Sequence, residues 1–197
     1  MRLCGYFGGI PRVSITRGIV RIARFRIDGL AEFEATKQSF LNSLAPLLAF
    51  PLVGALLELG QGGVLAAFTD LFASVVAVLL PLVLSEALAG FWGKHDNWLR
   101  YGVASNWSQW TMPMALAATI AGFWVVEQMG VKLDQNAVAG AAVGVVFYGV
   151  ALHYFLARAG LGLSRGKAVL LILVCDVATV VAVLGPRLLV LHASGGV

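Results

Sequence analysis

The chain has 197 residues, of which 59% are hydrophobic and 12% are charged, and its mean hydropathy is +0.87. A soluble domain carries roughly 25% charged residues, so this composition excludes a water-soluble globule and predicts one compact membrane domain. The two cysteines, Cys4 and Cys175, have neither disulfide nor metal-ligand spacing.

A basic arm opens the chain. Seven of the 14 Lys and Arg residues precede the first long apolar run, and we assign residues 1–38 to this arm. It could bind nucleic acid, but contact with anionic lipid headgroups at the cytoplasmic face explains the charge more simply, and we expect no nucleic-acid partner.

Within and just beyond the arm, residues 19–40 alternate cations with apolar side chains such as Ile22, Phe25 and Phe33. This pattern is typical of an amphipathic segment that lies along the membrane interface; an ordinary connecting helix is the alternative.

Five apolar windows reach the length of about 20 residues that a helix needs to cross the hydrocarbon. They are Phe40–Leu59, Val64–Phe91, Ser108–Gln128, Ala137–Ala157 and Ala168–Leu191. The sequence therefore predicts an all-α fold, a polytopic bundle of about five transmembrane helices within residues 39–192, followed by a short tail at residues 193–197.

The connections between the windows are short and polar. Gly60–Gly63 predicts a tight hairpin between the first two helices, Lys94–Ser105 a charged loop, and Asp134 or Asn136 an N-cap for the fourth helix. If the N-terminus is inside, 12 of the 14 cations lie on the cytoplasmic side. The positive-inside rule then predicts an N-in, C-out topology, which we place in a bacterial inner membrane.

Ionisable side chains within the windows are the sharpest functional signal, because a charge in hydrocarbon is costly and needs a partner or water. Depth along the predicted helices sorts them into two groups. An inner cluster, near one membrane face, contains Glu86, Asn106, Gln109, His153 and Asp176. An outer pair, Asp70 and Arg187, is expected to form an ion pair between the second and fifth helices. Packing contacts and a proton-responsive or ligand-binding cavity are both compatible with the inner cluster.

Small residues predict where the fourth helix packs. Gly140 and Gly144 form a GxxxG motif, and further small residues line a second side of the same window. A central helix with two neighbours is the expected arrangement, and a homodimer face is the other use of the motif.

Catalytic signatures are absent from the sequence. It contains no HExxH, P-loop, GxSxG or CxxC motif, so we expect no enzyme, no cofactor and no metal site. His153 alone could ligate a heme or a chlorophyll-type pigment, but no second matched histidine accompanies it.

The layout resembles the bacterial members of the Yip1-like membrane family: a cytoplasmic N-terminal segment, the phenylalanine-rich stretch FEATKQSFLNSLAP, then five compact helices over roughly Asp28–His192. The loop ARAGLGLSRGKA is similar to those of uncharacterised inner-membrane proteins of alphaproteobacterial type. The Asp-Leu-x-Gly-Pro element of eukaryotic Yip1-like proteins does not occur, so their partners are not implied. The resemblance implies a membrane scaffold without catalytic residues.

Two functions follow from these observations. The first is a non-enzymatic scaffold or accessory subunit that binds other membrane proteins or a second copy of itself. The alternative is a small proton-coupled transporter that uses the inner cluster. Five helices do not divide into two equal inverted repeats, a common transporter plan, unless the protein dimerises. A cavity that reaches Asp176 would favour transport.

Overall fold

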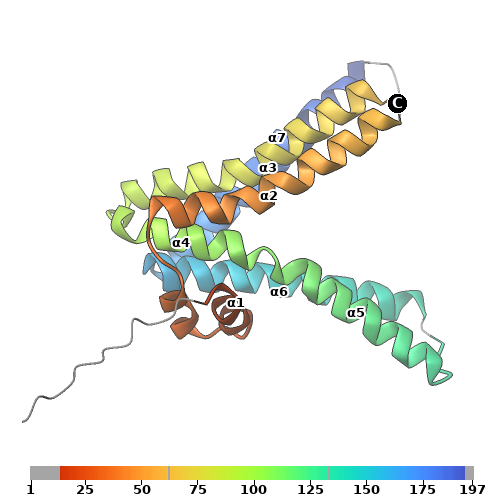
Figure 1. Ribbon diagram of the computed structural model, residues 1–197, viewed down its shortest axis with the longest axis horizontal. Coiled ribbons are helices and arrows are strands. Elements are labelled where there is room, and N and C mark those ends of the chain that lie inside the picture. Colours follow the sequence, from red (N-terminus) through yellow and green to blue (C-terminus); the bar gives the residue numbers. More distant parts are fainter. Residues whose placement is uncertain (1–13, 62, 133, 194–197) are drawn as a thin grey trace, which may run out of the picture.

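The computed structural model describes residues 14–61, 63–132 and 134–193, with the backbone alone at residue 66 and at residues 186–193. Across these residues the chain is helical, and no β-strand occurs among them (Figure 1). In chain order the elements are α1 (Ile15–Ala23), the 3-10 helix η1 (Ile27–Glu32), α2 (Lys37–Gly60), α3 (Val64–Phe91), α4 (His95–Ser108), α5 (Thr111–Gln128), α6 (Gln135–Leu161) and α7 (Arg165–Ala193).

Five of these segments are long and apolar enough to cross a membrane: α2, α3, α4 together with α5, α6 and α7. Each coincides with one predicted window, so the predicted all-α, five-span fold is confirmed. The predicted cap of the fourth span is also present, because the Asp134 carboxylate accepts a hydrogen bond of 2.7 Å from the Ala137 backbone N–H at the start of α6. The N-in orientation stays a prediction.

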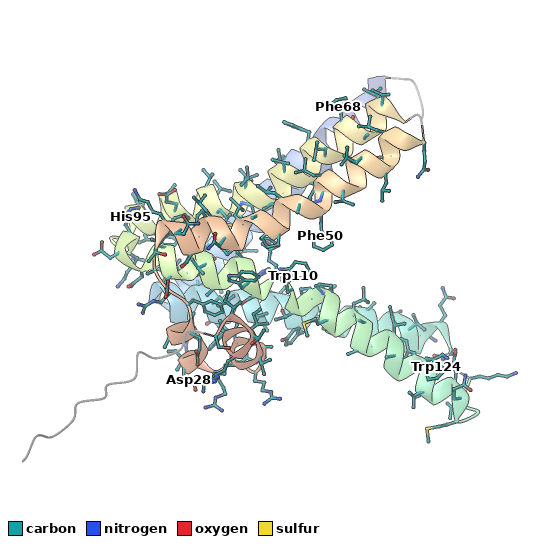
Figure 2. The ribbon with its side chains drawn as sticks, viewed as in Figure 1. Asp28, Phe50, Phe68, His95, Trp110 and Trp124 are labelled. Atoms are coloured by element: carbon teal, nitrogen blue, oxygen red, sulfur yellow. The ribbon has the colours of Figure 1, made fainter. Side chains whose placement is uncertain are left out.

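The molecule is V-shaped (Figure 1). Helices α2, α3 and α7 pack side by side in one limb, and α5 packs against α6 in the other. The limbs meet at a base, which consists of α1, η1, α4 and the adjoining ends of α2, α3, α6 and α7. Phe50 of α2 and Trp110 lie where the limbs part, with ring centroids 5.1 Å apart (Figure 2).

The buried apolar side chains gather in the base. One cluster joins α3, α4, α6 and α7; the other joins α1, η1, α4 and α6. The first includes Leu82, Trp98, Leu161 and Leu171, and the second includes Ile22, Leu30, Phe33, Val103 and Leu156. In the limbs, by contrast, much of the apolar surface stays uncovered: only 6–17% of each spanning window is buried inside the protein. The limbs therefore leave most of their surface to lipid or to another protein.

Helix α4 corrects the sequence prediction of a charged loop at Lys94–Ser105. Only its first residue is outside a helix, and α4 packs against α1, α2, α3 and α6 at the centre of the base. One buried polar group of α4 is paired inside the protein: the Trp98 Nε1 donates to the Ser85 Oγ at 3.1 Å. A hydropathy profile hides such a helix because its exposed polar residues, among them Asp96 and Arg100, lower the mean hydropathy of the whole segment.

The segment at residues 19–40, predicted to lie along the membrane interface, is folded into α1 and η1 and packs on the base of the protein. Helix α1 and η1 fold against each other, and the apolar side chains of Ile22, Leu30 and Phe33 are buried in the base. Gly18 permits the close approach, because a Cβ there would lie 2.6 Å from the Phe33 ring. The opposite face of α1 carries arginines and remains exposed.

Candidate functional site

A cavity of about 560 Å³ lies where α6 and α7 diverge, at the junction of the base and the limbs. Side chains from α3, α4, α6 and α7 line it, together with Gln109, which caps the C-terminus of α4, and Met112 in the first turn of α5. Pockets that hold small molecules have volumes of about 300–1,000 Å³, so this cavity is large enough for a small solute.

Helical spacing explains how polar groups reach this cavity. Tyr101, Ser105 and Gln109 follow one another at four-residue intervals, so they share one side of α4 and its C-terminal end. On α7 the same interval separates Cys175 from Thr179. The cavity therefore receives hydroxyl and amide groups from α4 and its C-terminal end, and a thiol and a hydroxyl from α7.

Asp176 of α7 and His153 of α6 are the ionisable groups at its centre. Both line the cavity, and both side chains are exposed. Among the described residues that line the cavity, none is Lys or Arg. One carboxylate without a compensating cation favours a positively charged or hydrogen-bonding occupant over an anion.

The structure brings three residues of the predicted inner cluster together: Gln109, His153 and Asp176. Glu86 lies elsewhere. It is exposed on α3 and does not line the cavity, whereas its neighbour Ser85 does. One residue along a helix is a rotation of about 100°, which separates the two side chains.

Asn106 also lies apart from the cavity, on the side of α4 that faces α2. It is completely buried, and its Nδ2 donates to the Ser43 Oγ at 3.0 Å. Its position assigns it to the packing of α2 on α4 rather than to a site.

The other predicted residues lie in the limbs. Asp70 is exposed on α3, and the side chain of Arg187 is outside the described residues, so the outer pair stays a prediction. Gly140 and Gly144 are exposed on α6, and a Cβ at either would meet no atom within 4 Å. The close helix contact of α6 falls instead at Gly149, beside Met112 of α5.

Sequence reasoning missed Tyr101 and Ser105 because it placed them in a loop. The four-residue interval that links them to Gln109 was the signal that could have found them. Within the described part of the chain, no three His, Cys, Asp or Glu side chains are grouped to hold a metal ion.

Comparisons with protein-family models, curated proteins and solved structures found no match. The fold and the cavity therefore define the class by themselves: a polytopic helical membrane protein with a largely apolar cavity that contains one acid and one histidine, at the base of two diverging limbs.

Proposed function

We propose that this chain is a small membrane transporter that binds a cationic or hydrogen-bonding solute in the cavity and exchanges protons at Asp176 and His153. The observation that carries the proposal is the cavity itself, because it holds an acid and a histidine from two different spanning helices. Ionisable groups within membrane spans commonly mark solute pathways and proton relays. A bacterial inner membrane with the N-terminus inside is the setting we propose.

The geometry supports movement as well as binding. His153 and Asp176 belong to helices that are packed together in the base and separate beyond it. A change in the angle between the limbs would therefore change the width of the cavity mouth while the packed base stays intact. Rocking of one helical unit against another around a fixed site is the usual form of alternating access.

Thiol labelling in sealed vesicles tests whether the cavity holds water. In a chain whose own cysteines, Cys4 and Cys175, are replaced by serine, Thr179→Cys places a thiol in the cavity wall. Val177→Cys is the matched control, because Val177 is 58% exposed on α7 but does not line the cavity. We expect a membrane-impermeant methanethiosulfonate reagent to modify position 179 and to leave position 177 unmodified.

The charge of the reagent tests the preference for cations. Relative to their rates with a free thiol in solution, a cationic methanethiosulfonate should react with the cysteine at position 179 about ten-fold faster than its anionic counterpart. Asp176→Asn should remove most of this normalised ratio, because the ratio reflects the Asp176 charge. If position 179 stayed as unmodified as position 177, water would not reach the cavity and the transport proposal would be refuted.

A scaffold or accessory subunit is the second candidate, and the uncovered limbs favour it. Exposed side chains such as Phe68, Phe72, Trp124 and Phe147 leave room for helices of a partner. The resemblance of the sequence layout to bacterial Yip1-like proteins would imply the same role. Purification in mild detergent would support this candidate if one partner remained bound in a fixed ratio, and would count against it if the chain were a stable monomer.

A further inference from the structure

Helix α1 has two unlike faces. Gly18 and Ile22 are buried against η1 and the base. Arg17, Arg21 and Arg24 recur at helical spacing on the other face. With Ser14, Thr16, Val20 and Arg26 they line a shallow groove of about 480 Å³.

The groove carries a net positive charge. Four guanidinium groups face it, and two carboxylates lie behind them: Arg21 contacts Glu32 at 3.0 Å, and Arg26 contacts Asp28 at 2.9 Å. These ion pairs orient the guanidinium groups without neutralising the groove. Each guanidinium has five N–H donors, so donors remain for a further anion.

Arg24 differs from its neighbours. It is exposed, and it forms no ion pair among the described residues. Its charge is therefore available to an external ligand without loss of an internal contact.

The position of α1 along the spans sets its depth. The Tyr148 hydroxyl of α6 donates to the Ala23 carbonyl at 2.9 Å, which fixes the end of α1 at this level. The next residue, Gly149, lies beside Met112 in the first turn of α5. The groove is therefore level with the first turn of α5 and with the middle of α6. Helix α5 has 18 residues, which is about 27 Å of helix and close to the roughly 30 Å of hydrocarbon.

Exposed apolar side chains adjoin the arginines. Val20 is 46% exposed, Phe25 42% and Ile27 65%, and the unit that carries them lies on the side of the base away from α2, where Asp28 is labelled in Figure 2. Apolar and cationic groups side by side match the boundary between acyl chains and headgroups.

We propose that this arginine groove binds the phosphate of an anionic phospholipid in the adjoining leaflet. Guanidinium groups bind phosphate oxygens through paired, charge-assisted hydrogen bonds. The exposed Val20, Phe25 and Ile27 would contact the acyl chains of the same lipid, which a free phosphate ion does not possess. The arginine groove is separate from the cavity that contains His153 and Asp176, so the lipid proposal does not depend on the transport proposal.

Native mass spectrometry of the purified full chain tests this binding, with phosphatidylglycerol and phosphatidylcholine as the probes. We expect retention of phosphatidylglycerol over phosphatidylcholine. Loss of one cation near a headgroup lowers affinity about five-fold, so Arg24→Gln should weaken phosphatidylglycerol binding about five-fold and Arg17→Gln with Arg24→Gln about 25-fold.

Arg158→Gln with Arg165→Gln is the matched control, because it removes the same charge from exposed positions outside the groove. Binding by the control should remain near that of the unchanged protein. Equal loss in both double variants would show an unspecific charge effect and overturn the proposal. Displacement of the lipid by millimolar inorganic phosphate would also overturn it, since the site would then be one for free phosphate. Because Arg24 makes no internal ion pair, the single variant keeps the test valid if the double variant misfolds.

Discussion

The contact between Gly18 and Phe33 predicts that Gly18→Ala loosens the N-terminal segment. A Cβ at position 18 would lie 2.6 and 2.7 Å from two carbons of the Phe33 ring and 3.1 Å from the Glu32 Cβ. Phe33 is only 3% exposed, so its ring has little room to move away. The alanine therefore pushes α1 away from η1.

The size of the effect follows from two opposing terms. Overpacking a buried contact costs about 1–3 kcal/mol, and two ring carbons below 3 Å place this contact in the upper part of that range. Alanine is also a better helix former than glycine by about 1 kcal/mol. The net destabilisation of the docked segment is about 1–2 kcal/mol, which raises the undocked population about 5- to 30-fold.

Trypsin measures this population directly, because Arg17 and Arg21 are cleavage sites within α1. Cleavage tracks the open fraction when opening and closing are faster than proteolysis, so Gly18→Ala should be cut there about 5- to 30-fold faster. Val20→Ala, on the exposed face of α1, is the control and should change the rate little.

A rescue variant sharpens the test. Phe33→Leu removes the ring carbons that the new Cβ would meet, so the Gly18→Ala, Phe33→Leu double variant should be less destabilised than the sum of the two single changes. Strictly additive effects, or an unchanged cleavage rate in Gly18→Ala, would refute the argument from close packing.

Two further substitutions follow from contacts in the base. Ser43→Ala should lower the stability of the detergent-purified protein by about 1–3 kcal/mol, because it leaves the buried Asn106 amide without its 3.0 Å acceptor; thermal unfolding measures this, and Ser43→Ala combined with Asn106→Leu should recover part of the loss. Gly162→Ala should destabilise by about 1–2 kcal/mol, because Gly162 has φ +64°, and unchanged stability would contradict this reading of the turn.

The five spans were predictable because each contains about 20 apolar residues, a signal that does not depend on tertiary contacts. The helical nature of α4 was not predictable in the same way. Its Trp98 and Asn106 side chains are buried, and each donates a hydrogen bond to a serine of another helix. Such pairing is invisible in a hydropathy profile because the partner is distant in sequence.

For the candidate site, the sequence predicted how deep each residue lies along its span, but it did not predict which side of the helix each residue faces. Depth along each span placed His153 and Asp176 at one level, and the structure brings both to one cavity. The side that a residue faces was not determined, because a span that is apolar on all sides gives no preferred rotation about its axis. Glu86, one residue from the cavity-lining Ser85, was therefore grouped with a site that it does not line.

The hydrogen bond between Tyr148 and Ala23 also orders events during synthesis. The two residues are 125 positions apart, and at about 5–20 residues per second the ribosome needs about 6–25 s to travel from one to the other. Throughout that interval Ile22 and Phe33 lack the α6 side of their buried cluster. Helix α1 and η1 can therefore pack against α4 first, but their docking on the base is completed only after α6 has been synthesised.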